Sequence, residues 1–252
     1  MISHTFNWHA RRDGFSLIEL LIAIFITLFL VAGMLGILVS MRGTFQTQDL
    51  LERAQENERF ALTVLDNTLR NAGFFSNPTA TTPAMAFPAT TVTNADGTTF
   101  AVAQIVSGTT AATTAASDTV TVRFQTVNGD GLTNCLGDTN TTGTAITWTN
   151  SFAVNASNQL VCSVSTNGSA STAQVVLVDN VASMKVLYGV DTNADGSVDE
   201  YLASGAISTA PSWDDVKAVR LQMTFQSLID QKTGVPISLP PLTHSISLMN
   251  KS

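Results

Sequence analysis

The chain has 252 residues, of which 44% are hydrophobic and only 12% are charged, and its formal net charge is −7. This length is enough for one ordinary globular domain with an appended segment. The acidic balance argues against direct binding of nucleic acid, because phosphate binding needs clustered Lys and Arg, and the cations beyond residue 100 are scattered. A surface poor in charge and rich in Thr, Ser, Asn and Gly is typical of an extracytoplasmic protein.

A long apolar run lies near the N-terminus. A polar segment ends with Arg11 and Arg12, Gly14 follows, and residues 15–41 then contain one ionisable side chain, Glu19. The run exceeds the roughly 20 residues that a helix needs to cross a bilayer and the roughly 7–15 apolar residues of a signal peptide. The two arginines favour a cytoplasmic N-terminus. We therefore expect a membrane-spanning helix, with the rest of the chain on the outer side of the membrane.

Glu19 is the unusual residue of this run. A carboxylate inside a membrane helix costs roughly 3 kcal/mol unless it is paired or protonated, so it is functional by default. If the chain is cut between Gly14 and Phe15, the new amino group of Phe15 lies one helical turn from Glu19. The two groups can then pair within a chain, or between neighbouring chains, where they set the axial register of an assembly. The alternative is a Glu that snorkels to the membrane surface or stays neutral.

The order of these residues resembles the N-terminal signal of type IV pilins and pseudopilins. The matching segment reads RRDGFSLIEL, residues 11–20. The resemblance implies that a prepilin peptidase cuts after Gly14, that Phe15 becomes the N-methylated terminus, and that Glu19 is the assembly carboxylate. Asp13, an acid directly before the glycine, departs from the family pattern.

Residues 45–72 continue the helix as an amphipathic segment, because apolar residues recur at spacings of three, four and seven. Gly73 is a natural helix stop. The stretch QENERFALTVLDNTLRNAGF narrows the resemblance to PilW-type minor pilins and, more distantly, to the J-type pseudopilins of type II secretion. The apolar positions are Leu50, Leu51, Ala54, Ala61, Leu62, Leu65, Leu69 and Ala72.

The remainder of the chain is expected to be rich in β-strands. Residues 76–117 read as long surface loops around a weak strand at 101–106. Alternating apolar residues predict further strands at 118–127, 145–149, 159–164, 173–178, 185–190, 216–225 and 244–249. Strands without intervening helices imply antiparallel pairing, so the predicted fold class is α+β, a long N-terminal helix packed on an antiparallel β-sheet domain. The predicted segments are a leader at 1–14, a transmembrane helix at 15–41, its amphipathic continuation at 42–73, and a periplasmic globular domain at 74–252.

The two cysteines, Cys135 and Cys162, do not lie in a CxxC motif, so a zinc or thioredoxin-type site is not indicated. In an exported domain we expect them to form a disulfide that closes a loop of about 27 residues and contributes about 3 kcal/mol. The alternative is two unrelated buried thiols.

One acidic segment predicts a calcium site. It places acid and amide side chains at alternate positions and a Gly at the sixth, which resembles the first half of an EF-hand loop. The bidentate Glu expected at position twelve is replaced by Leu202. The alternative is a strand connection built from Asx turns. The expected calcium ligands are Asp191, Asn193, Asp195, Ser197 and Asp199.

No catalytic motif is present in the sequence. After removal of the leader, His244 is the one histidine left, so a His-rich zinc site is excluded and a Ser-His-Asp site would have to use it. We expect a noncatalytic protein with His244 near the surface of a strand.

The resemblance implies a minor pilin that primes or caps type IV pilus assembly and supports twitching motility, adhesion and DNA uptake. The implied partners are the prepilin peptidase, other minor and major pilins, the inner membrane and a pilus-tip adhesin. The implied location is the inner membrane before assembly and a pilus at the cell surface afterwards. Two alternatives stay open: a pseudopilin of a type II secretion system, and a membrane-anchored extracytoplasmic binding domain.

Overall fold

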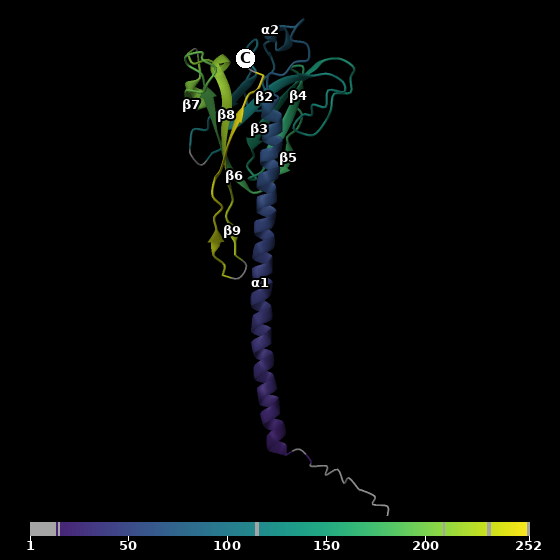
Figure 1. Ribbon diagram of the computed structural model, residues 1–252, viewed down its shortest axis with the longest axis vertical. Helices are drawn as coiled ribbons and strands as arrows, with labels where there is room; N and C mark the ends of the chain where they lie inside the picture. Colours follow the sequence, from purple (N-terminus) through teal and green to yellow (C-terminus); the bar gives the residue numbers. More distant parts are fainter. Residues whose placement is uncertain (1–13, 15, 114–115, 209, 231–232, 251–252) are drawn as a thin grey trace, which may run out of the picture. The chain divides into compact units, whose positions relative to one another are not determined.

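A computed structural model describes residues 14, 16–113, 116–208, 210–230 and 233–250. The chain divides into two compact units. One comprises the chain up to Asp49 together with Asp230–Val235, and the other comprises Leu50–Ile229 with Pro236–Ser252. A single helix, α1 (Leu17–Arg70), contributes its first part to one unit and its second part to the other (Figure 1).

The first part of α1 buries almost nothing within the chain. Its large apolar side chains from Leu17 to Met41 are between 45% and 81% exposed. Within the described residues, α1 is the one helix that is long and apolar enough to cross a membrane. A Cβ added at Gly33 or Gly36 would have no neighbour within 4 Å. Any close packing at these glycines therefore involves another molecule.

The second part of α1 lies in the core of the globular unit. Its buried residues, Ala61, Leu65, Thr68 and Leu69, recur at spacings of three and four and so form one stripe of the helix surface. The helix ends at Arg70, close to its expected end. Gly73 adopts the left-handed conformation, with φ of 78°, that a helix stop of this kind requires.

The strands form antiparallel sheets, which confirms the α+β fold class. The five-stranded sheet is a meander in chain order and consists of β1 (Val106–Thr109), β2 (Thr119–Thr126), β3 (Ile146–Val154), β4 (Leu160–Thr166) and β5 (Val175–Val178). The four-stranded sheet has the order β11-β8-β6-β7 and consists of β6 (Val181–Val190), β7 (Glu200–Leu202), β8 (Val216–Phe225) and β11 (Leu242–Ser247). A separate hairpin pairs β9 (Leu228–Ile229) with β10 (Pro236–Ile237). The short helices are α2 (Pro83–Ala86), η1 (Ser204–Ala206) and η2 (Trp213–Asp215).

Both large sheets and α1 contribute to one apolar core. The fully buried side chains include Leu65 of α1, Phe124 and Phe152 of the five-stranded sheet, and Tyr188 and Leu221 of the four-stranded sheet. Burial of a side chain of this size contributes about 2 kcal/mol. The amphipathic half of α1 is therefore part of the folding unit of the domain.

One predicted strand is wrong. The sequence favoured a strand at 101–106, but β1 begins at Val106. In place of a strand ladder, the backbone carbonyls of Ala101 and Gln104 accept hydrogen bonds from the side chain of Arg123, and Ala103 takes a positive φ of 61°.

The side chain of Arg123 supplies the hydrogen-bond donors that a neighbouring strand would otherwise provide in this region. Its side chain is 1% exposed, and its guanidinium lies over the ring of Phe100, 4.6 Å from the ring centroid. Burial lowers the pKa of Arg123 to about 10. The guanidinium donates hydrogen bonds to the carbonyl oxygens of Phe87, Pro88, Ala101 and Gln104. One cation on β2 thereby fixes two loop segments that have little regular structure.

Replacement of Arg123 tests this role. In Arg123→Met, the carbonyl oxygens of Pro88 and Gln104 lose their donor, whereas those of Phe87 and Ala101 keep a backbone N–H donor. Each unsatisfied buried group costs about 1–3 kcal/mol. We expect the free energy of unfolding to fall by about 3–5 kcal/mol, measured by denaturant titration of the detergent-solubilised protein. The matched control is Arg59→Met, which changes an exposed arginine of α1 and is expected to shift stability by less than about 0.5 kcal/mol. Equal stability of the two variants would contradict the role.

Candidate assembly interface

The N-terminal end of α1 carries the residues on which assembly was predicted to depend. Gly14 is exposed, and Glu19 lies in the first turn of α1, where an acid is favoured by the helix dipole. Phe15 lies outside the described residues. Within the part of the chain that the structure describes, Glu19 makes no hydrogen bond or ion pair. Its pairing with the amino group of Phe15 therefore stays a prediction.

The exposed apolar surface of α1 continues directly from Glu19. Within this segment the hydroxyl of Thr27 donates to the carbonyl of Ala23 at 2.7 Å, so its polar group is satisfied inside the helix. A surface of this kind is stable in lipid or in a bundle with other helices, where the backbone needs no water. The arrangement is an apolar rod with one carboxylate at its beginning.

The predicted disulfide is present. Cys135 and Cys162 are bonded and nearly fully buried, which fixes the loop before β3 onto β4. The backbone N–H of Cys135 also donates to Oδ1 of Asn150, at 2.8 Å. The covalent bond and the hydrogen bond hold the same loop against neighbouring strands.

Asp66 joins α1 to the last strand. Its Oδ1 lies 3.0 Å from Nε2 of His244 on β11, and its Oδ2 accepts a hydrogen bond of 2.6 Å from Nε of Arg70. Burial raises the pKa of Asp66, but the hydrogen bonds from Arg70 and His244 outweigh it, so the pKa lies below its ordinary value. His244, which was predicted near the surface of a strand, lies on β11 and contacts Asp66. We call the contacts of Asp66 with Arg70 and His244 the clasp.

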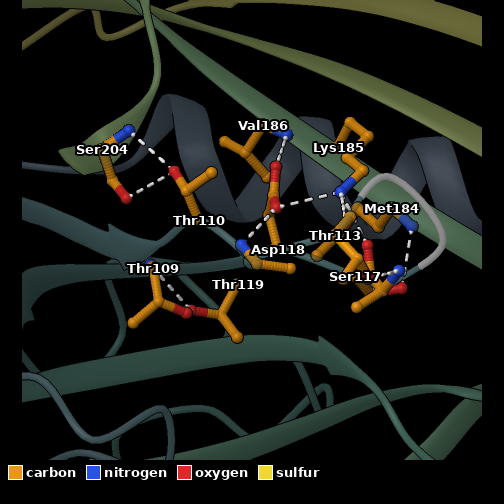
Figure 2. Close-up of polar contacts among 12 residues, drawn as sticks. Thr109, Thr110, Thr113, Ser117, Asp118, Thr119, Met184, Lys185, Val186 and Ser204 are labelled. Atoms are coloured by element: carbon orange, nitrogen blue, oxygen red, sulfur yellow. Dashed lines mark hydrogen bonds and ion pairs between the residues drawn. The ribbon is translucent and has the colours of Figure 1, made fainter. Parts of the chain in front are cut away.

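Asp118 joins the two large sheets (Figure 2). Its Oδ1 accepts from the N–H of Ala111 at 2.8 Å, and its Oδ2 accepts from the N–H of Val186 on β6 at 2.9 Å. The ammonium of Lys185 lies 3.4 Å from Oδ1. The backbone N–H of Asp118 donates to the carbonyl of Met184 at 2.8 Å. The sequence predicted a strand that begins at Asp118, but not the partners of this residue, which lie 67 and 68 residues away.

The acidic loop between β6 and β7 brings the predicted calcium ligands into one turn. Asp191 accepts from the N–H groups of Asp195 and Gly196, and Asn193 accepts from the N–H of Asp195. The hydroxyl and N–H of Thr192 donate to Oδ2 of Asp199 and lower the pKa of that carboxyl. The contacts of Asp195 N–H with Asn193 and of Ser197 N–H with Asp195 are Asx-type turns. The described residues contain no group of three His, Cys, Asp or Glu arranged to hold a metal ion. Calcium binding stays a prediction.

Two protein-family models match the chain. One, described as Type IV Pilus-assembly protein W, matches residues 141–244, and the other, described as a prokaryotic N-terminal methylation motif, matches residues 9–35. No curated protein matches the chain. The first match runs from before β3 into β11, and the second covers Gly14, Glu19 and the start of the apolar helix.

The match to the methylation motif, the long apolar helix and the antiparallel β-sheet domain are features of a membrane-anchored, type IV pilin-like protein. Within that class, the two family matches support a PilW-type minor pilin. Both matches point to a structural, noncatalytic protein that interacts with other pilins and with the pilus machinery.

The clasp at Asp66 predicts a specific pH dependence. Because the pKa of Asp66 is lowered on folding, its contribution is fully present above about pH 4, near its unfolded pKa, and is lost as the pH falls through the folded pKa. We expect Asp66→Asn to be about 1 kcal/mol less stable at pH 7 and to lose less stability than the wild type below pH 4. Denaturant unfolding from pH 2 to pH 7 measures both, and parallel pH curves would contradict the clasp.

Calcium titration tests the acidic loop. If calcium binds there, ten times its dissociation constant should stabilise the full-length protein in detergent by about 1.4 kcal/mol, a rise of roughly 3 °C in Tm. Asp195→Asn should weaken the response, and magnesium should give a smaller one. A Tm that does not move at millimolar calcium would leave the loop as a set of Asx turns.

Proposed function

We propose that this protein primes or caps the assembly of a type IV pilus and thereby supports twitching motility, adhesion and DNA uptake. The observation that carries the proposal is the apolar part of α1, which is exposed along its whole length and has Glu19 in its first turn, five residues after Gly14. A chain with this surface needs either a bilayer or other helices around it.

Before assembly, the inner membrane holds the subunit through this helix, and the β-sheet domain lies in the periplasm. The prepilin peptidase removes residues 1–14, which creates an amino group on Phe15. Transfer of the helix from lipid into a bundle keeps its apolar side chains away from water, so this step needs little net hydrophobic free energy. Transfer into the bundle is favoured instead by polar groups that have no partner in lipid and gain one in the bundle.

Glu19 supplies such a group. A carboxylate in a low-dielectric helix bundle is stabilised by a nearby cation, and the amino group of Phe15, on the same chain or a neighbouring one, is the cation that cleavage provides. This pairing selects one axial position of a subunit relative to its neighbours. In this position the subunit would contact other minor and major pilins and a pilus-tip adhesin.

The family match favours a pilus over a secretion system. The matched segment, residues 141–244, covers most of the strands of the β-sheet domain and belongs to a pilus-assembly family. The N-terminal features are shared with secretion pseudopilins, so the β-sheet domain carries the distinction.

The assembly role is tested in sheared filaments. We expect mass spectrometry of the filament fraction to find this protein with an N-methylated Phe15 as its first residue. Glu19→Gln should reduce its incorporation at least tenfold, which corresponds to a loss of about 1.4 kcal/mol. Glu52→Gln, an exposed acid on the same helix, is the matched control and should incorporate normally. Intact residues 1–14 in filaments, or normal incorporation of Glu19→Gln, would contradict the proposal.

A further inference from the structure

The five-stranded sheet ends in an open edge at β5. β5 pairs with β4 on one side, and it is the last strand in the sheet order. Among the described residues, no hydrogen bond reaches the backbone of Val175–Val178 except those of its ladder with β4. The outer side of β5 therefore presents backbone N–H and C=O groups in the spacing of a strand.

This edge is short, and its register with β4 shifts between Leu160 and Val161, but it has no charged residue and no proline to oppose pairing. Proteins discourage edge pairing with Lys, Pro, bulges or inward-pointing charges. Residues 169–178 read SASTAQVVLV and contain no charged residue and no proline. Val175 and Val176 are each 45% exposed, and successive residues of a strand point to opposite faces. Both faces of the edge are therefore apolar and accessible.

A groove of about 430 Å³ lies beside this edge, on the core-facing side of the sheet. Val175 is paired with Cys162, whose side chain lies in the core, so Val175 and Leu177 point to the same side as that cysteine. Both residues line the groove. The opposite wall is α1, with Phe60 and Val64, and the disulfide loop supplies the rest, Thr133–Asp138.

The edge and the groove together specify the shape of an occupant. A sixth strand added to β5 would satisfy the free backbone groups, and every second side chain of that strand would point into the groove between β5 and α1. A helix cannot satisfy the edge, because its backbone groups are already paired. Phe60 is 50% exposed and offers an unpaired aromatic surface to such side chains.

The charges of the groove restrict the occupant further. Asp138 is its one charged lining residue, and that carboxylate already accepts a hydrogen bond of 3.1 Å from the amide of Asn134. An uncharged segment suits most of this surface, because a charged side chain placed against the uncharged lining residues would lose water.

We propose that β5 and this groove receive an uncharged, extended segment of a neighbouring pilin subunit, which adds a sixth strand to the sheet and places alternate apolar side chains against Phe60 and Val64. The nature of the partner rests on the proposed function. The strand pairing itself rests on the open edge, on Val175 and Val176, and on the position of the groove.

Site-specific photocrosslinking in filament-forming cells tests the proposal. A benzophenone amino acid replaces Val176 in one strain and Phe60 in another. Mass spectrometry then maps the crosslinked residues in the full-length protein, in both the membrane fraction and the sheared filaments. We expect both positions to crosslink to one uncharged segment of another pilin subunit. Val102, a valine that is 54% exposed in a loop, is the matched control and should not crosslink to that segment.

A substitution in the groove adds a second readout. Phe60→Asp should lower the crosslink yield from position 176 about tenfold, because an acid in the groove opposes apolar side chains. Met85→Asp makes the same kind of change at a methionine that is 69% exposed and remote in sequence, and it should leave the yield unchanged. Equal Tm values for the two variants exclude a folding defect. If Phe60→Asp lowers Tm, the crosslink map from position 176 in the otherwise unchanged protein decides.

The outcomes separate this inference from the proposed function. Crosslinks to a helix, to a charged segment, to lipid or to no partner would overturn the strand pairing, even if the protein is found in filaments. Crosslinks to the expected segment in the membrane fraction, without incorporation into filaments, would uphold the strand pairing and contradict the pilus role.

Discussion

Between Leu17 and Met41 the chain leaves its apolar side chains uncovered, and this exposure constrains the rest of the molecule. Water is an unfavourable environment for such a helix, so the free energy of the protein depends on what surrounds it. The same stretch begins with a carboxylate, which a bilayer tolerates poorly. The helix therefore combines an apolar surface that is stable in lipid with one carboxylate that is not.

The β-sheet domain can form few ion pairs, because only 12% of the residues of the chain are charged. Two of its charged residues, Arg123 and Asp118, are buried, and each binds several backbone groups. Arg123 donates to four carbonyl oxygens, and Asp118 binds β6 and the loop that follows β1. Each of these groups replaces several backbone hydrogen bonds that irregular segments cannot make for themselves. The domain is therefore sensitive to a few polar residues.

The sequence predicted the parts of the fold that follow from local periodicity. The alternation at 216–225 gave β8 with its observed bounds, and the stripe around Leu65 gave the buried face of α1. The strand expected at 101–106 was wrong because an arginine about twenty residues later supplies the partners of those carbonyls. No local pattern encodes that contact.

The candidate site divides in the same way. Gly14, Phe15 and Glu19 were predicted from their order along the chain, and their roles stay predictions. Cys135 and Cys162 were predicted to pair, and they are bonded. The partners of Asp66 and Asp118 lie 178 and up to 68 residues away, and the β5 groove exists only where α1, a strand and the disulfide loop meet. Contacts of this range depend on topology, which a single sequence states only indirectly.

The burial of Leu65 and Leu69 has a mechanical consequence. The part of α1 from Ala61 to Leu69 is packed in the core of the β-sheet domain. Load applied along α1 therefore acts as shear across a packed interface, in which many contacts must break together. Such a joint resists pulling better than a flexible tether, so the domain should stay folded when a load acts along this helix.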